Sequence, residues 1–226
     1  MKIDHSKLVE LSHRMIPGRE KFQLDIAVRD VTEYLPEVTH REDIWYVLTD
    51  IEMNSHMGTH IEFPHHHYKE GATGADFPLG QLVANAVVLD FSHKKKDEWI
   101  TLAEVRAYEG QIQKGDIVFV RTDMDRYFRE PNWNDEVHME AGALDWILQF
   151  GPSVVGTDAT GFEVPGTDHQ PNHLALFTRG VGMIESATNL KAIQGERALV
   201  FILPLPIEGI DACPVRIIAI KEGGII

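Results

Sequence analysis

Short apolar segments rich in β-branched residues recur along the chain, and they restrict its fold more than any other feature. Most are continuous in hydrophobicity rather than alternating, which is typical of strands that are covered on both faces. The segment before the first histidine cluster mixes aromatic, β-branched and polar residues instead. The expected strands are Trp45–Met53, Ala86–Phe91, Ile117–Arg121, Ser153–Gly156, Val181–Ile184, Ala198–Leu203 and Val215–Ile220.

Two segments carry helix patterns. The residues Thr101-Leu102-Ala103-Glu104 form a capping box, which predicts a helix that runs to about Glu109. Met139 to Phe150 predicts a second helix, which Gly151-Pro152 ends. Its expected buried face is Ala143, Leu144, Ile147 and Leu148. Because strands outnumber helices and the two kinds are mixed, we expect an α/β or α+β single domain over residues 1–226, with a mixed sheet and flanking helices.

Charge and composition exclude several classes of function. The formal net charge is −14, with 35 acidic and 21 basic residues, which argues against binding nucleic acid, because phosphate contacts depend on Lys and Arg. No apolar run approaches the ~20 residues of a membrane helix, and Met1–His5 lacks the apolar core of a signal peptide. Cys213 is the only cysteine, so no intrachain disulfide forms, and we expect it to pack as a small apolar residue. We therefore expect a cytoplasmic protein.

Five of the chain's 12 histidines lie between residues 56 and 67. His56, His60 and Glu62 can together supply the three protein ligands of a mononuclear metal site, which leaves a position open for water. A metal held in this way activates water near neutral pH. The spacing of His56 and His60 matches a helical zinc motif. However, Met57 stands where that motif needs Glu, and Gly58 and Pro64 disfavour a helix, so we expect irregular or extended backbone.

A second pair of metal-ligating residue types, His173 and Glu185, lies far downstream. Glu185 follows the apolar run Val181–Ile184, which places it at the end of a strand. A carboxylate buried there needs a counter-charge, and a metal ion would provide one. The alternative is an exposed glutamate at the edge of the sheet.

These motifs resemble the cyclase family of metal-dependent hydrolases, which includes bacterial kynurenine formamidase and isatin hydrolase. The family pattern is His-x-Gly-Thr-His-x-Asp-x-Pro-x-His, and residues 56–66 match it except that Glu62 replaces the aspartate. A second family pattern is a histidine before an apolar helix start, then a strand that ends in Glu, then Asn-Leu. Here it is represented by His173, Glu185 and Asn189-Leu190.

The resemblance implies a fold, a metal site and an assembly. The fold would be a swivelling β/β/α domain, and the cofactor one or two Zn²⁺ or Mn²⁺ ions per subunit. His56, His60 and Glu62 would bind the first ion, and Glu62, His173 and Glu185 the second, with Glu62 bridging. The extra methylene of Glu62 could change this bridging geometry or remove the second ion. Family members are usually oligomers, so we expect a homodimer or homotetramer.

The expected activity is hydrolysis of an amide carbon–nitrogen bond in a small-molecule substrate, either an aryl formamide such as N-formylkynurenine or a cyclic amide. The resemblance makes His66 the catalytic histidine. An amide nitrogen leaves poorly unless it is protonated, and His66 would act as the general acid that protonates it. The alternatives are a metal-dependent cyclase or dehydratase, a lactone hydrolase, and a metal-binding oligomer without enzymatic activity.

Several nearby residues have weaker expected roles. His65 and His67 flank His66 and are expected to point elsewhere, and His169 is expected in an exposed loop. The loop from Asp158 to Asn172 is expected to cover the pocket or to meet a neighbouring subunit. Phe63, Phe162 and Trp45 are candidates for an aromatic pocket wall, but packing explains such residues equally well. Residues 129–135 are expected to form a surface loop.

Overall fold

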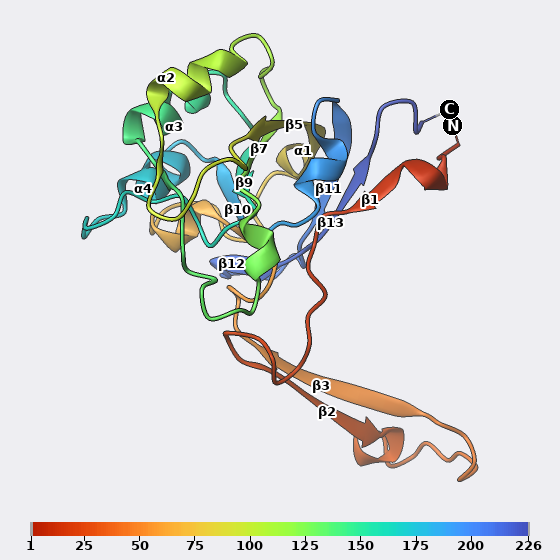
Figure 1. The fold of residues 1–226 in the computed structure, drawn as a ribbon. Coiled ribbons are helices and arrows are strands. Elements are labelled where there is room, and N and C mark those ends of the chain that lie inside the picture. Colours follow the sequence, from red (N-terminus) through yellow and green to blue (C-terminus); the bar gives the residue numbers. More distant parts are fainter. Residues whose placement is uncertain (1, 226) are drawn as a thin grey trace.

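A nine-stranded mixed sheet forms the centre of the molecule in the computed structural model, which describes residues 2–225 (Figure 1). In spatial order its strands are β1 (Leu8–Glu10), β13 (Arg216–Ile220), β11 (Ala198–Leu203), β5 (Val83–Asp90), β7 (Ile117–Arg121), β9 (Val154–Thr157), β10 (Gly182–Glu185), β4 (His60–Glu62) and β12 (Ala212–Pro214). The four central strands β5, β7, β9 and β10 are parallel, and the outer pairs are antiparallel. The predicted mixed α/β fold is therefore confirmed.

The central strands are covered on both faces, as their continuous hydrophobicity predicts. In β7, Val118 and Val120 belong to one buried cluster, while Ile117 and Phe119 belong to another on the opposite face. The first cluster lies under α2 (Leu102–Val105), α3 (Ala141–Leu148) and α4 (Pro171–Phe177), which gather on one side of the sheet (Figure 1). The second cluster joins Ile61 of β4 and Ile217 of β13, strands near opposite ends of the sheet. The sheet therefore curls around this second core.

The predicted helices form, with shorter bounds than expected. Thr101 and Glu104 make the reciprocal hydrogen bonds of a capping box, and the 3-10 turn η4 (Arg106–Tyr108) extends α2. The four predicted core positions of α3 are all buried. The remaining short elements are α1 (Leu79–Leu82), η1 (His5–Lys7), η2 (Val31–Glu33), η3 (Pro64–His66), η5 (Met124–Tyr127), η6 (Leu190–Ile193) and the strand pair β6 (Trp99–Ile100) and β8 (His138–Met139). Among the described residues, no helix has the length and apolar character needed to cross a membrane.

A two-stranded arm, made of β2 (Leu24–Asp30) and β3 (Val47–Met53), projects away from this body (Figure 1). Strand β3 matches the expectation, whereas β2 was not expected. Ile26 pairs with Ile51 and Val28 with Thr49, so one face of the arm is largely apolar. Ile26, Val28 and Ile51 are all more than half exposed.

Candidate metal centre and active site

Strand β4 directs its two polar side chains to one face and its apolar side chain to the other. Side chains alternate along a strand, so His60 and Glu62 share a face while Ile61 enters the core. Strand β10 lies antiparallel to β4 and sets Glu185 directly opposite His60. The register of two short strands therefore brings Glu185 to His60 and Glu62, although the sequence separates it from them by more than 120 positions.

Each of the three expected histidine ligands has one ring nitrogen held by an oxygen acceptor. His60 Nδ1 donates to the Gly58 carbonyl oxygen at 2.9 Å. His173 Nδ1 donates to Glu163 Oε2 at 2.7 Å, and His56 Nε2 donates to Asp211 Oδ2 at 2.9 Å. Oriented metal-ligating histidines have this arrangement, in which one nitrogen donates to an oxygen and the other faces the metal.

The other ring nitrogens converge on two carboxylates. His56 Nδ1 lies 3.0 Å from Glu62 Oε1, and His60 Nε2 lies 3.6 Å from both Glu62 and Glu185. His173 Nε2 is likewise 3.6 Å from both carboxylates. Two groups of ligand atoms result, each within 4.8 Å: His56, His60 and Glu62, and Glu62, His173 and Glu185. Glu62 belongs to both, as a bridging ligand would.

The donor set fits divalent cations. Among the described residues, His60 Nε2 and Glu62 Oε2 are buried without a hydrogen-bond partner, and such buried atoms are costly unless something satisfies them. Imidazole nitrogen and carboxylate oxygen are ligands that zinc and manganese both accept. A cation at each group would satisfy the unpartnered atoms and neutralise the two buried carboxylates.

Protonation balances the charge of this site when no cation is bound. Burial disfavours the charged form of His56, but hydrogen bonds to Glu62 and Asp211 outweigh it and raise the pKa of His56 to about 9. Burial also disfavours the charged form of His173, but hydrogen bonds to Glu163 and Glu185 outweigh it and raise the pKa of His173 to about 10. Burial also opposes ionisation of Glu62, yet the contact with His56 and the nearby charges of His60 and His173 hold the pKa of that carboxyl well below its usual value. Because metal binding requires neutral imidazoles, a cation must displace protons from these histidines.

Two glycines let the backbone approach the site closely. Gly58 lies between His56 and His60 with φ +62°, and a Cβ there would lie 3.2 Å from Met15 Cγ. Gly161 has φ +142°, and a Cβ there would lie 3.0 Å from Glu185 Oε1. Residues with a Cβ rarely adopt such φ values, so glycine permits both the turn before β4 and the close packing of the Gly161 loop on Glu185.

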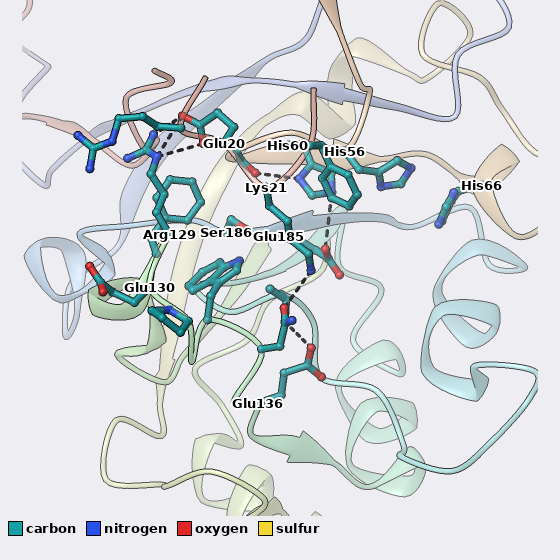
Figure 2. A pocket seen from close by; sticks show the side chains of 18 residues that line it. Glu20, Lys21, His56, His60, His66, Arg129, Glu130, Glu136, Glu185 and Ser186 are labelled. Carbon is teal, nitrogen blue, oxygen red and sulfur yellow. Dashed lines mark hydrogen bonds and ion pairs between the residues drawn. The ribbon is translucent and has the colours of Figure 1, made fainter. Parts of the chain in front are cut away.

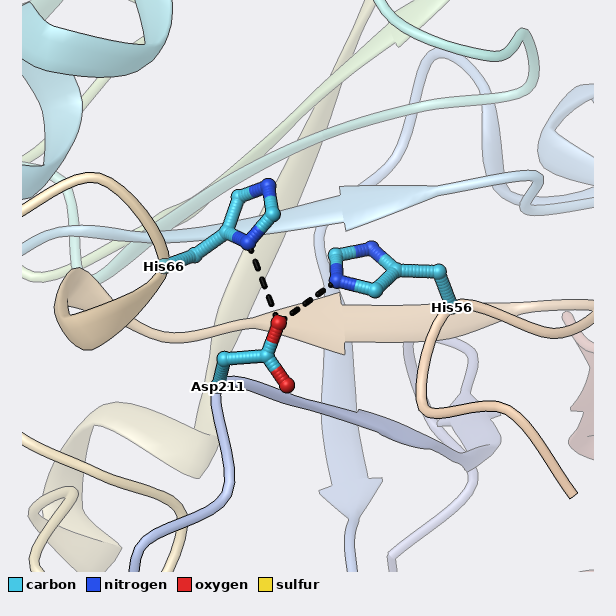
Figure 3. Close-up of side chains that lie close together, drawn as sticks. All are labelled: His56, His66 and Asp211. Carbon is cyan, nitrogen blue, oxygen red and sulfur yellow. Dashed lines mark hydrogen bonds and ion pairs between the residues drawn. The ribbon is translucent and has the colours of Figure 1, made fainter.

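His66 lies beside the ligand cluster on the 3-10 turn η3. Its Nδ1 is 3.1 Å from Asp211 Oδ2 (Figure 3). Its Nε2 is 3.8 Å from Glu62 Oε1. Burial lowers the pKa of His66 and outweighs the attraction of the Glu62 charge. A neutral ring with Nδ1–H donated to Asp211 leaves Nε2 free to accept and return a proton at the ligand cluster.

A cavity of about 750 Å³ opens over this cluster (Figure 2). His56, His60, His66 and Glu185 line one part of it. Phe22, Phe128 and Trp133 contribute aromatic side chains to the remaining wall. The size is within the range of small-molecule sites, which combine apolar walls with a few convergent polar groups.

Of the three aromatic residues considered for the pocket wall, none lines the pocket, and packing in the core accounts for two of them. Phe63 and Phe162 are fully buried in the two cores, because their strands and loops direct them inward. Trp45 lies on the arm, where it is 82% exposed. Residues 129–135 form a loop with several exposed residues, as expected, and this loop also supplies Trp133 to the pocket.

The flanking histidines differ in their surroundings. His65 Nδ1 bonds the Lys69 carbonyl oxygen, and His169 is exposed beside Asp168, as expected for a loop residue. His67 stacks on His173 with ring centroids 5.1 Å apart, and burial lowers the pKa of His67 to about 4. His173 itself lies inside α4 rather than before its start.

Two residues that support the site were not predicted from the sequence. Glu163 binds the His173 ring from the loop between Asp158 and Asn172, so this loop packs against the metal centre. Asp211, just before β12, holds His56 and His66. Neither stands in a recognisable local pattern. The only sequence signal is a lone acidic residue in a loop, which is common without any function.

Comparison with known proteins agrees with this geometry. The family model of the cyclase family, described as "Putative cyclase", matches residues 9–164, well over half of the chain. A kynurenine formamidase of Salinibacter ruber is 27% identical over 95% of this chain and 94% of its own length. An isatin hydrolase of Roseibium aggregatum is 26% identical over 86% of this chain and 81% of its own.

Solved structures agree as well. A potential metal-dependent hydrolase with cyclase activity is 26% identical, with a TM-score of 0.74 over 94% of this chain and 96% of that one. An isatin hydrolase bound to the product analogue thioisatinate has the same fold, with a TM-score of 0.80 and 20% identity over 94% of this chain and 91% of that one. The chain therefore belongs to the cyclase family of metal-dependent hydrolases and is a hydrolytic enzyme.

Proposed function

We propose that this enzyme hydrolyses the carbon–nitrogen bond of an amide. The proposed substrate is either an aryl formamide, such as N-formylkynurenine, or a cyclic amide. Relatives named kynurenine formamidase and isatin hydrolase match nearly the full chain. The pocket supports the choice, because its aromatic side chains, Phe22, Phe128 and Trp133, suit an aryl group. An aryl ring packed against them would direct an attached amide toward His66 and the ligand cluster.

We also propose the ligands of the metal. His56, His60 and Glu62 would hold one Zn²⁺ or Mn²⁺ ion, and Glu62, His173 and Glu185 a second. The observation that carries the proposal is the orientation of three histidines, each with one nitrogen bound to an oxygen and the other aimed at Glu62 or Glu185. When bound, such a cation supplies Lewis-acid activation of water and of a carbonyl oxygen.

His66 is proposed as the residue that moves the proton. Its neutral ring takes a proton at Nε2 as water attacks, and returns that proton to the departing nitrogen. The hydrogen bond from Nδ1 to Asp211 keeps Nε2 directed at the ligand cluster during both transfers. Burial of Glu62 and Glu185 excludes bulk water from the floor of the site, which strengthens electrostatic interactions there.

The test is a comparison of three substrate classes with the metal-loaded enzyme. N-formylkynurenine is expected to release formate, followed enzymatically or by NMR, and a chelator is expected to abolish the release. Isatin represents cyclic amides, and an aryl lactone represents ester bonds. Ring opening of isatin alone would place the enzyme among cyclic amide hydrolases, whereas turnover of the lactone alone would contradict amide hydrolysis.

We further propose that the chain forms a homodimer, or a tetramer built from such dimers, through the arm. An isolated two-stranded hairpin is marginally stable in water, and an exposed apolar face marks an interaction site. Ile26, Val28 and Ile51 supply that face. A second copy of the chain suits it, because members of the resembled family usually associate with themselves.

The variant Ile26→Glu/Ile51→Glu is expected to be monomeric. In the proposed dimer both isoleucines would be buried, and each would contribute about 1.5–3 kcal/mol to association. In a two-fold dimer the loss occurs on both subunits, so the dissociation constant should rise by more than about 100-fold. Light scattering after size exclusion measures the mass. Leu79→Glu alters a residue on α1 that is 81% exposed and outside the arm, and it should leave the assembly unchanged. A monomeric wild-type protein, or a double variant that stays dimeric, would contradict the assignment.

A further inference from the structure

We propose that Asp211 is a positioning residue that fixes the rings of His56 and His66 at the same time, so that one carboxylate serves both the metal centre and proton transfer. The part that concerns His56 stands on the ligand geometry. The part that concerns His66 rests on the proposed function.

A single oxygen of Asp211 makes both contacts. Oδ2 lies 2.9 Å from His56 Nε2 and 3.1 Å from His66 Nδ1 (Figure 3). The two imidazole rings lie next to each other, with centroids 4.4 Å apart. Because the carboxylate accepts and both nitrogens donate, the two rings are held on either side of one charged atom.

Asp211 is itself held firmly. Its Oδ1 accepts from the Ser55 hydroxyl at 3.0 Å, and its backbone carbonyl accepts from the Phe63 N–H at 2.9 Å. The next residue, Ala212, begins β12 and pairs with Glu62. The backbone of Asp211 is therefore tied to the strand that carries His60 and Glu62, which sets the position from which its side chain reaches His56 and His66.

The Asp211 carboxylate accepts hydrogen bonds from three side chains, those of Ser55, His56 and His66. An ionised carboxylate is an acceptor only. It therefore requires N–H at His56 Nε2 and at His66 Nδ1, which assigns Nδ1 of His56 and Nε2 of His66 to the ligand cluster.

The same three residues could instead form a cation site of their own, because their ligand atoms lie within 4.8 Å. The hydrogen-bond distances favour the positioning role, since two donors at 2.9 and 3.1 Å already occupy Oδ2. A third cation per chain is therefore an outcome that would overturn the proposal.

The test compares Asp211→Ala and Asp211→Asn with Glu208→Gln, a matched control that removes one carboxylate from the exposed loop three residues earlier. The first readout needs no substrate. In zinc-loaded protein with ¹⁵N-labelled histidine, NMR is expected to show His66 with its proton on Nδ1 in the wild type and in the control. In Asp211→Ala it should show the Nε2–H form or a mixture of both.

The second readout is metal binding, measured by competition with a chromophoric chelator. Loss of a residue that orients a metal ligand costs about 10–100-fold in affinity or activity, so Asp211→Ala should weaken at least one cation by that factor. Asp211→Asn keeps the shape of the side chain without its charge, and its metal affinity should fall between those of the wild type and Asp211→Ala. It also gives a folded comparison if the alanine variant is unstable.

The third readout is turnover at saturating metal. kcat should fall by about 10–100-fold in Asp211→Ala while KM changes less than about threefold, and added acetate should restore part of kcat. An unchanged His66 tautomer together with wild-type metal affinity would overturn the proposal. If no amide is turned over by any variant, the proposed function fails, while the NMR and metal readouts still decide whether Asp211 positions the two rings.

Discussion

His66→Ala is expected to lower kcat by about 10²–10⁴-fold, the usual contribution of general acid–base catalysis, with no loss of bound metal. The side chain lies beside the ligand cluster, yet its own nitrogens are directed to Asp211 and toward Glu62 at 3.8 Å. Removal of the imidazole therefore takes away the group that carries the proton and leaves the metal donors in place. Steady-state turnover and elemental analysis of the same preparation measure the two quantities.

His65→Ala is the matched control, because it removes the neighbouring histidine from the same turn. His65 bonds the Lys69 carbonyl oxygen and does not line the pocket, so its loss should change kcat by less than about twofold, as for most surface substitutions. Full activity in His66→Ala would remove His66 from the mechanism. Loss of metal in that variant would instead make His66 a ligand.

The strands of the central sheet could be predicted because burial on both faces leaves a continuous apolar run, as in Ile117–Arg121. Strand β2 was missed although Leu24, Ile26 and Val28 alternate with Asp25 and Arg29 in the period of a strand. Such alternation indicates one buried face, whereas in this chain the apolar face of the arm is exposed.

The ligands of the candidate metal site could be predicted because imidazole and carboxylate are unusual inside a protein and carry their chemistry in their residue type. The residues that support these ligands could not be predicted, because the sequence around a loop aspartate or glutamate does not show whether it is solvated or bound to a histidine. Asp211 acquires its role only through the pairing of β12 with β4, which brings it to a residue 155 positions away.

The aromatic residues of the pocket wall could not be predicted for a related reason. Phe63 and Phe128 have the same side chain, and only tertiary structure decides which of them enters the core. Phe63 follows β4 and turns into the core with Ile61 and Phe77. Phe128 stacks on His13 at the end of η5 and faces the cavity. Residue type alone carries no information about this choice.

Glu62→Ala is expected to abolish tight binding of both cations, because Glu62 is the carboxylate common to the two ligand groups. Loss of a residue that merely supports a ligand costs about 10–100-fold, so loss of the shared ligand should lower activity by more than about 100-fold. It also leaves His56, His60 and His173 without the anion around which they converge. Titration of the metal-free variant with zinc or manganese measures the stoichiometry.

Two further variants separate bridging from a general loss of charge. Glu185→Gln changes a ligand of the second group only, so it should retain one tightly bound ion where Glu62→Ala retains none. Glu62→Asp installs the residue that the resembled family carries at this position, and it should restore binding and most of the activity. Two ions bound by Glu62→Ala as tightly as by the wild type would contradict the bridging role. Identical stoichiometries in Glu62→Ala and Glu185→Gln would show that the two ligand groups do not depend on a shared carboxylate.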